Sequence, residues 1–166
     1  MGHHHHKKDS PISVTLGILS LSSTRSLADD KSGLWIKEQV EKHGHRVLCH
    51  HVVDDRASLI ADTLLSEIKE KKPDVMLLTG GTGISKKDVT IEAVKALFSK
   101  ELTAFGVLFA QMSYTEIGAS AILSRATAGI IDQTAVFCMP GSLNACKLAC
   151  TMLIFPELGH IVKHIN

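Results

Sequence analysis

Aromatic residues are scarce in this sequence, since Phe, Trp and Tyr together make up 4% of it. Proteins that hold single-stranded nucleic acid stack the bases on aromatic side chains, and this chain has few of them. The formal net charge is +1, so no overall field favours nucleic acid or an acidic membrane surface. No uninterrupted apolar run is long enough to span a bilayer, and no signal peptide precedes the first expected strand. We therefore expect neither a nucleic-acid partner nor a membrane partner.

Cysteine is also uncommon, with 4 residues in a chain of 166. These cysteines show neither a Cys-x-x-Cys pair nor the spacing of a zinc site. Cys146 and Cys150 are separated by one helical turn, and we expect them to be small buried apolar side chains on one helix face. This usage predicts a reducing, cytoplasmic compartment.

Histidine is frequent, but part of that frequency comes from the run His3 to His6 directly after Met1 and Gly2. The run indicates a tag, so residues 1–10 are set aside as a tag-like tail and residues 11–166 are expected to form a single domain. None of the other histidines lies at metal-ligand spacing from a carboxylate or a cysteine. We expect them at the surface or at helix ends.

Apolar periodicity predicts alternating strands and helices in the first hundred residues. Runs rich in β-branched and aliphatic residues predict strands over 12–19, 45–53 and 74–79. Helical spacing of apolar residues predicts helices over 34–43, 58–71 and 89–98. This alternation predicts an α/β fold of three layers, in which a mostly parallel sheet lies between helices.

The second part of the chain is less regular. A helix is expected over 109–117, and the rest of residues 99–126 gives no clear pattern. Strands are expected over 128–131 and 134–139; the two residues between them suit a hairpin, although their turn chemistry is weak. The remaining expected elements are a helix over 143–153 and a final short helix from Pro156 onward.

A glycine-rich stretch, Thr79-Gly80-Gly81-Thr82-Gly83, follows the third expected strand and precedes a helix. This order of elements points backbone N–H groups at an anionic ligand, because glycine lets the backbone approach a phosphate without an intervening Cβ. The stretch lacks the Gly-Lys-Ser/Thr ending of nucleotide P-loops and the Gly-x-Gly-x-x-Gly pattern of dinucleotide sites. Taken alone, it suits a tight turn as well as a phosphate site.

Two carboxylates are expected beside this glycine-rich stretch. Right-handed crossovers place the loops after all parallel strands at one edge of the sheet, which would bring residues 22–25 and Asp55 close to it. Asp55 ends the second strand and Asp88 follows the glycines, so the two could hold Mg²⁺, which bridges phosphate oxygens. Alternatively, Asp88 could cap the next helix, and Asp54 and Asp55 could form a solvated turn.

Four cationic side chains are candidates for phosphate contacts, namely Arg25, Lys86, Lys87 and Arg125. Arginine can hold a phosphate with two hydrogen bonds, whereas lysine acts as a point charge. Lys86 and Lys87 would suit an exposed pair near a helix start equally well. The serines have no histidine and acid at a recognisable spacing, which excludes a serine hydrolase.

Several short motifs follow one another along nearly the whole chain after the tail. They are Ser22-Ser23-Thr24-Arg25, Asp29-Asp30-Lys31-Ser32-Gly33, Asp54-Asp55, Thr79-Gly80-Gly81-Thr82-Gly83, Asp88-Val89-Thr90-Ile91-Glu92-Ala93, Phe105-Gly106, Glu116-Ile117-Gly118, Leu123-Ser124-Arg125 and Met139-Pro140-Gly141-Ser142. In this order and spacing they resemble the MoaB/MogA family of molybdenum cofactor biosynthesis proteins, and MoaB more than MogA. Many relatives have Asp or Asn where this chain has Ser23, so the chain departs from the family pattern in that loop.

The resemblance implies a molybdopterin-binding fold and a nucleotidyltransferase that acts in molybdenum or tungsten cofactor biosynthesis. Such an enzyme binds molybdopterin and transfers AMP from ATP to its terminal phosphate, with release of pyrophosphate. The resemblance assigns catalysis and a Mg²⁺ ion to Asp55 and Asp88. It assigns substrate binding to Ser22, Thr24, Arg25, Thr79, Gly80, Gly81, Thr82, Gly83, Pro140, Gly141 and Ser142. It also implies a homotrimer or homohexamer that contacts other cofactor-biosynthesis proteins.

Two other interpretations remain open from the residues. The chain could be a non-catalytic molybdopterin carrier of the same fold, which Ser23 mildly favours and the presence of Asp55 and Asp88 disfavours. It could also be a generic nucleotide-binding α/β domain, in which case ATP would bind without competition from a pterin.

Overall fold

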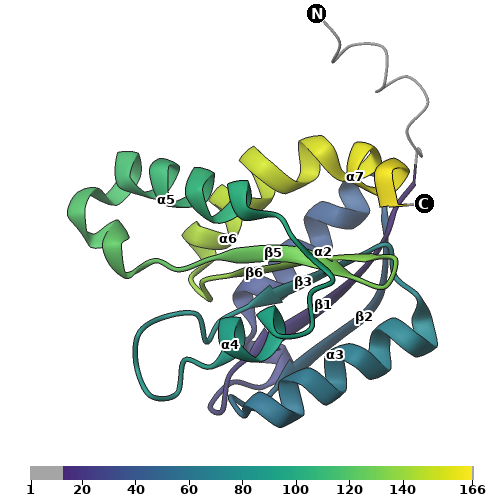
Figure 1. The fold of residues 1–166 in the computed structure, drawn as a ribbon, viewed down its shortest axis with the longest axis horizontal. Helices are drawn as coiled ribbons and strands as arrows, with labels where there is room; N and C mark the ends of the chain where they lie inside the picture. Colours follow the sequence, from purple (N-terminus) through teal and green to yellow (C-terminus); the bar gives the residue numbers. More distant parts are fainter. Residues whose placement is uncertain (1–12, 166) are drawn as a thin grey trace, which may run out of the picture.

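The computed structural model describes residues 13–165 (Figure 1). The expected tag and the start of the first expected strand, Ile12, lie outside the described residues. Within the described part, the strands are β1 (Thr15–Leu21), β2 (Arg46–Val53), β3 (Val75–Thr79), β4 (Lys100–Glu101), β5 (Thr127–Ile131) and β6 (Thr134–Met139). They form one sheet in the order β2-β1-β3-β6-β5-β4. Strands β2, β1, β3 and β6 pair in parallel, whereas β5 runs antiparallel to both of its neighbours.

Helices connect these strands and cover the sheet. The α-helices are α2 (Lys31–Lys42), α3 (Ala57–Lys71), α4 (Thr90–Lys95), α5 (Thr103–Ile117), α6 (Leu143–Ala149) and α7 (Leu158–Ile165). Short 3₁₀ segments are η2 (Leu27–Asp29), η3 (Gly118–Leu123) and η5 (Phe155–Glu157), and η4 (Cys150–Ile154) is a π-helical turn between α6 and η5.

The sheet separates two hydrophobic cores, as the residues of β3 illustrate. Val75 and Leu77 face the core that α2, α5, α6 and α7 cover, whereas Met76 and Leu78 face the core that α3 and α4 cover. Successive residues of a strand point to opposite faces, so a strand that is apolar at every position must be covered on both. Figure 1 shows α5, α6 and α7 on one side of the sheet and α3 and α4 on the other. The predicted three-layer α/β fold is confirmed.

Several boundaries differ from the predictions for identifiable reasons. The first strand is displaced toward the C-terminus and reaches Leu21. Helix α2 begins before the predicted Leu34, because the Asp30 carboxylate accepts the Gly33 N–H and caps the helix there. The predicted end is confirmed, since Gly44 has a φ of 81° directly after the C-cap.

The predicted helices and strands differ most from the structure around residues 99–126, where the sequence pattern is weakest. The helix predicted over 109–117 is confirmed but begins at Thr103, because α5 is apolar around its whole circumference and shows no clear periodicity at its start. Helix α4 is shorter than predicted and ends at Lys95. Strand β4 and segment η3 were not predicted. The hairpin between β5 and β6 is confirmed, with Asp132 at a φ of 51° in the turn.

The helical run Leu143–Ile165 is long and largely apolar, although Lys147, Glu157 and Lys163 interrupt it. By length and composition alone it is apolar enough to cross a membrane, and 39% of its most apolar window is buried inside the structure. Core helices of soluble proteins pass the same test. Here Cys146, Cys150, Ile154 and Leu158 face the core beneath α6 and α7, which accounts for the apolar composition. The predicted burial of Cys146 and Cys150 is confirmed.

Candidate functional site

The candidate site lies where the carboxyl ends of the parallel strands meet. After β1 the chain continues into α2 on one face of the sheet, and after the neighbouring β3 it continues into α4 on the opposite face. Ligands of open α/β sheets bind in the crevice outside the strands at such a change of winding direction. Residues 80–83, called the glycine loop below, leave β3 at this point (Figure 1).

The backbone of the glycine loop fits tightly against two other strand ends. Gly80 has a φ of 101°, and a Cβ built on it would lie 2.5 Å from the carbonyl oxygen of Leu21 at the end of β1. The Gly80 N–H donates to the carbonyl of Met139 at the end of β6, at 3.0 Å. A side chain at position 80 would therefore push β1 away from β3. Glycine is required here by both the φ angle and the close approach.

Thr90, the first residue of α4, ties down the carbonyl groups of the glycine loop. Its buried hydroxyl donates to the carbonyl of Gly80 at 2.9 Å, and its N–H donates to the carbonyl of Gly81 at 3.0 Å. These bonds occupy carbonyl groups, so they hold the loop without using its N–H groups. The arrangement is suited to an anionic ligand.

Asp55 brings the loops after β1, β2 and β3 together. Its Oδ2 accepts the Ser23 N–H at 3.0 Å and the Ser23 hydroxyl at 3.3 Å. Its Oδ1 lies 3.4 Å from the position that a Cβ on Gly81 would take. The structure thus places Asp55 between residues 22–25 and the glycine loop, as the strand topology predicts.

Asp88 closes the far end of the glycine loop and does not cap α4, so the capping alternative is wrong. The N-cap of α4 is Val89. The Asp88 Oδ2 instead accepts the Ser85 N–H at 2.8 Å and lies 2.8 Å from the ideal Cβ position of Gly83. Hydrogen bonding to Ser85, helped by the backbone of Gly83 and the charge of Arg125, lowers the pKa of Asp88. A carboxylate is therefore present at neutral pH.

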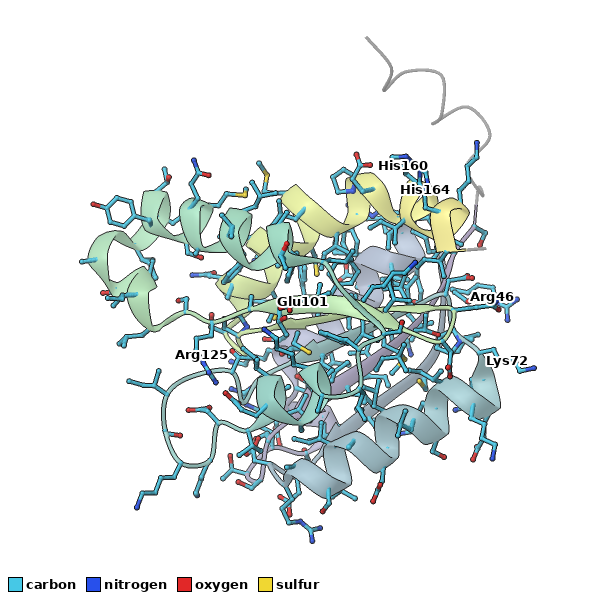
Figure 2. All side chains as sticks on the ribbon, viewed as in Figure 1. Arg46, Lys72, Glu101, Arg125, His160 and His164 are labelled. Atoms are coloured by element: carbon cyan, nitrogen blue, oxygen red, sulfur yellow. The ribbon has the colours of Figure 1, made fainter. Side chains whose placement is uncertain are left out.

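Arg125, two residues before β5, clamps the glycine loop, and Figure 2 shows its side chain beside the segment that leads into α4. Its Nε donates to the carbonyls of Thr82 and Gly83 at 2.9 and 3.1 Å. Its two terminal nitrogens donate to the Glu92 carboxylate at 2.7 and 3.2 Å. The guanidinium is committed to the loop and to Glu92, so the structure does not present Arg125 as a free phosphate contact.

Replacing Arg125 with Ala should loosen the glycine loop without unfolding the protein. Four hydrogen bonds disappear, but the pair with Glu92 is partly exposed and should contribute only about 1 kcal/mol to stability. We expect backbone amides in residues 82–88 to exchange hydrogen roughly 5-fold faster. Hydrogen exchange read by mass spectrometry checks this, with Arg46→Ala, an exposed residue of β2, as the matched control. Unchanged exchange in this segment would contradict the clamp.

The turn after β6 forms a further wall of the site. The Gly141 backbone approaches Gly80 so closely that a Cβ on Gly141 would lie 3.0 Å from the Gly80 Cα. Ser142 caps α6 by accepting the Ala145 N–H at 3.2 Å, and Ser32 donates to the Gly141 carbonyl at 2.9 Å. The hydroxyl of Thr79 is buried here without a hydrogen bond of good geometry among residues 13–165. The segment Pro140-Gly141-Ser142 therefore adjoins the glycine loop.

The other residues predicted for substrate binding lie in the loop after β1. The Ser22 hydroxyl accepts the N–H groups of Thr24 and Arg25 at 3.3 and 3.2 Å, which fixes a tight turn. Arg25 is exposed, as are Lys86 and Lys87 beyond the glycine loop. These three cations lie on loops at the edge where Asp55 and Asp88 lie.

A buried polar cluster behind the site was not predicted. The Asp30 carboxylate is fully buried and accepts the Ser20 hydroxyl, the Gly33 N–H at 3.0 Å and the His50 Nε2 proton, with 2.7 Å between His50 Nε2 and Asp30 Oδ2. Burial by itself raises the pKa of Asp30, but the hydrogen bonds from His50, Ser20 and Gly33 outweigh it and lower that pKa. The expectation that all histidines lie at the surface or at helix ends is wrong for His50.

This cluster orders the start of α2 against two strands. Ser20 belongs to β1 and His50 to β2, and Ser32 in the first turn of α2 reaches the Gly141 carbonyl. The motif Asp30-Lys31-Ser32-Gly33 was visible in the sequence, but only the fold shows that its aspartate caps a helix and meets His50. The cluster therefore positions the turn after β6.

A hollow of about 540 Å³ lies elsewhere on the described surface. Lys69, Lys72, Asp74 and Asp132 are among its lining residues, and they surround the amino ends of β3 and β6. It is therefore at the sheet edge opposite the glycine loop. Volume alone does not locate the chemistry here, because the hollow lacks the loop N–H groups and paired carboxylates described above.

Comparisons with known proteins agree with this geometry. A family described as "Probable molybdopterin binding domain" matches residues 17–160. The chain is 46% identical over 162 residues to the Bacillus subtilis (strain 168) protein named Molybdenum cofactor biosynthesis protein B, covering 97% of this chain and 95% of that protein.

Solved structures give the same result. A crystal structure of Molybdenum cofactor biosynthesis protein B is 46% identical, has a TM-score of 0.90, and covers 94% of this chain and 98% of the other. The Pyrococcus furiosus tungsten cofactor synthesizing protein MoaB is 38% identical, has a TM-score of 0.84, and covers 94% of this chain and 99% of the other.

Proposed function

This chain belongs to the molybdopterin-binding domain family, and we propose that it transfers AMP from ATP to the terminal phosphate of molybdopterin, with release of pyrophosphate. The names of its relatives place those proteins in molybdenum and tungsten cofactor biosynthesis, which supports the same role here. The observation that carries the proposal is the glycine loop, with Asp55 and Asp88 directed at Gly81 and Gly83. The Gly80 N–H donates to the Met139 carbonyl and the Gly83 backbone bonds to Asp88, so the N–H groups of Gly81 and Thr82 would be the ones to meet phosphate, next to two carboxylates that suit the accompanying cation.

The reaction joins two groups that repel each other. The terminal phosphate of molybdopterin attacks the α-phosphorus of ATP, a new P–O bond forms, and the bond to pyrophosphate breaks. The attacking phosphate is already ionised, so no side-chain base is needed. The protein contributes mainly alignment and charge stabilisation. Fixed N–H dipoles of the glycine loop would stabilise the charge that develops on the phosphoryl oxygens.

The donor set at the site fits Mg²⁺. Magnesium prefers carboxylate and phosphate oxygens. Asp55 receives hydrogen bonds on Oδ2 and presents Oδ1 to Gly81, and Asp88 is held on the other side of the loop by Ser85. We propose that Asp55 and Asp88 would hold the ion, which when bound supplies positive charge to the phosphate oxygens. Arg25, Lys86 and Lys87 would add counter-charge at the rim.

Molybdopterin and ATP would occupy different parts of the site. Ser22 and Thr24 would offer hydroxyl groups at the crevice, whereas Thr79 and Thr82 lie buried behind it. Pro140, Gly141 and Ser142 would close its side next to Gly80. A pterin needs hydrogen-bond partners and flat space, whereas a triphosphate needs N–H groups and cations. We therefore propose that both substrates bind along this edge of the sheet.

The proposal is tested by incubating the purified chain with molybdopterin, ATP and Mg²⁺. We expect equal amounts of adenylylated molybdopterin and pyrophosphate, which chromatography and a coupled pyrophosphate assay detect. Tight molybdopterin binding without product above background would overturn the proposed reaction. It would leave the carrier as the function of the site, and ATP binding without pterin competition would indicate a generic nucleotide-binding domain.

One observation favours the carrier as a second candidate. Ser23 donates both its N–H and its hydroxyl to Asp55 Oδ2, so one oxygen of the proposed Mg²⁺ ligand is already engaged by the protein. This contact orients Asp55, and it also reduces the electron density available to a metal. The assay above separates the two candidates.

We also propose that copies of this chain associate, as a homotrimer or homohexamer, in the cytoplasm. Large apolar side chains are exposed along α5 and η3, namely Val107, Leu108, Tyr114, Ile117, Ile122 and Leu123. An apolar patch of this kind usually marks an interaction surface. We propose that contact with other cofactor-biosynthesis proteins would also use exposed apolar side chains. All four cysteines are unpaired, which suits a reducing compartment.

A further inference from the structure

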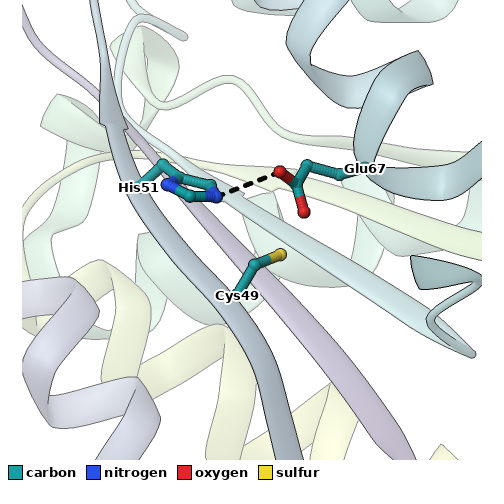
Figure 3. Close-up of side chains that lie close together, drawn as sticks. All are labelled: Cys49, His51 and Glu67. Carbon is teal, nitrogen blue, oxygen red and sulfur yellow. Dashed lines mark hydrogen bonds and ion pairs between the residues drawn. The ribbon is translucent and has the colours of Figure 1, made fainter. Parts of the chain in front are cut away.

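A second polar cluster lies on the face of the sheet that α3 covers, away from the glycine loop. Cys49 and His51 are alternate residues of β2, so their side chains point to the same face, and Glu67 points toward them from α3 (Figure 3). One ligand atom from each of the three residues lies within 4.8 Å of the others. His51 Nε2 is 3.0 Å from Glu67 Oε1.

We propose that Cys49, His51 and Glu67 bind a divalent transition-metal ion of the zinc class. Thiolate, imidazole and carboxylate form a common ligand set for zinc, and three protein ligands leave the fourth position of the tetrahedron to water. Spacing along the sequence did not reveal this cluster. The reason is that two ligands are alternate strand residues and the third comes from a helix that follows.

The cluster needs only small movements to become a coordination shell. With bond lengths of about 2.0 to 2.3 Å, tetrahedral ligand atoms lie roughly 3.3 to 3.7 Å apart. The contact between His51 and Glu67 must open by a few tenths of an ångström, and the wider separations, which reach at most 4.8 Å, must close by about 1.5 Å or less. His51 is exposed, so its ring can turn.

The charges around the cluster also suit a cation. Glu67 Oε2 is buried without a hydrogen bond of good geometry among the described residues, and the Lys71 ammonium lies 3.3 Å from it. Lys71 is partly exposed and can swing into solvent when a metal ion takes its place. Ions that prefer oxygen alone, such as Mg²⁺, gain little from a sulfur ligand, so the site should discriminate against them.

Cys49 must lose its proton when the sulfur–metal bond forms. Burial, reinforced by the hydrogen bond to Glu67 and the negative charge of Glu67, raises the pKa of the Cys49 thiol to about 12. Without metal the thiol is protonated. On binding, the proton passes to solvent and the thiolate replaces the thiol, so charge and atoms balance. The bound ion would link β2 to α3 without touching Asp55 or Asp88.

Cobalt titration of the full chain tests the site, because thiolate ligation gives a near-ultraviolet charge-transfer band that histidine alone cannot produce. His3 to His6 are replaced by Ala in all proteins so that the histidine run does not compete for metal. We expect one Co²⁺ per chain with this band, loss of the band on adding Zn²⁺, and no loss on adding Mg²⁺. Absence of the band, or displacement by Mg²⁺, would overturn the proposal.

Variants assign the band to its ligands. Cys49→Ser should abolish it, and His51→Ala and Glu67→Gln should each weaken Co²⁺ binding by at least about 100-fold. Lys71→Met should strengthen binding by roughly 2- to 5-fold, because it removes the competing cation. His164→Ala, which removes one member of the His160–His164 pair on α7, is the control and should leave the band unchanged (Figure 2). A band that survives in Cys49→Ser, with the fold checked by circular dichroism, would rule the site out.

Discussion

Replacing Asp88 with Asn should lower kcat for AMP transfer by about 100- to 1,000-fold, while the Kd for molybdopterin changes less than about 3-fold. The Asn side chain keeps the shape of Asp and can still accept the Ser85 N–H that holds the loop. It loses the negative charge of the carboxylate, which in our proposal binds Mg²⁺. The substitution should therefore weaken stabilisation of the charge that develops during phosphoryl transfer. It should leave the binding of the pterin nearly unchanged.

Steady-state kinetics and equilibrium molybdopterin binding, measured on the same preparations, check this prediction. Asp62→Asn removes a carboxylate from the exposed surface of α3 and should leave both quantities unchanged. Equal losses of kcat and molybdopterin affinity in Asp88→Asn would contradict the metal role, and would indicate that Asp88 serves only to shape the glycine loop. Raising the Mg²⁺ concentration should restore part of the activity if the charge is what matters.

Replacing Gly33 with Ala should destabilise the protein by about 3 kcal/mol. In an ordinary helix the same change adds about 1 kcal/mol of stability, because Ala has the higher helix propensity. Here an ideal Cβ would overlap Asp30 Oδ2 and His50 Nε2 and would lie 2.8 Å from Ser20 Oγ. Steric exclusion outweighs propensity, because the added methyl group must break a fully buried, hydrogen-bonded carboxylate cluster.

Urea unfolding followed by circular dichroism measures this effect. Lys31→Ala, an exposed change in the same helical turn, is the control and should stay within about 0.5 kcal/mol of the parent. Because Ser32 of the same turn bonds to the Gly141 carbonyl, Gly33→Ala should also weaken molybdopterin binding. Unchanged or increased stability would show that the cluster rearranges at little cost and does not position the turn after β6.

The elements that could be predicted are those with local signals. Strand β3 is apolar at every position, and its glycine-rich continuation is contiguous in the chain, so both were visible without the fold. The position of Asp55 beside the glycine loop followed from strand topology alone, since parallel strands share one carboxyl edge. Helix α5 had no clear start, because an apolar circumference carries little periodicity.

Roles set by contacts between distant segments could not be predicted. Arg125 was a candidate phosphate contact by residue type, and the structure commits it to Glu92 and to the loop carbonyls, more than 30 residues away. Asp88 suited a helix cap by local pattern, but its carboxylate turns back to Ser85 because α4 begins two residues later. For both Arg125 and Asp88 the local sequence pattern allowed two roles, and contacts formed in the folded structure determine which role applies.

The sequence by itself determined the layered α/β architecture, the family resemblance and the place of the glycine loop, because these rest on periodicity and on contiguous motifs. The tertiary structure alone decided that Asp30 meets His50, that Arg125 clamps the loop, and that Cys49 and His51 face Glu67. Such contacts join side chains on different elements, and which elements become neighbours depends on how the sheet and its helices pack. No local pattern along the chain encodes that choice.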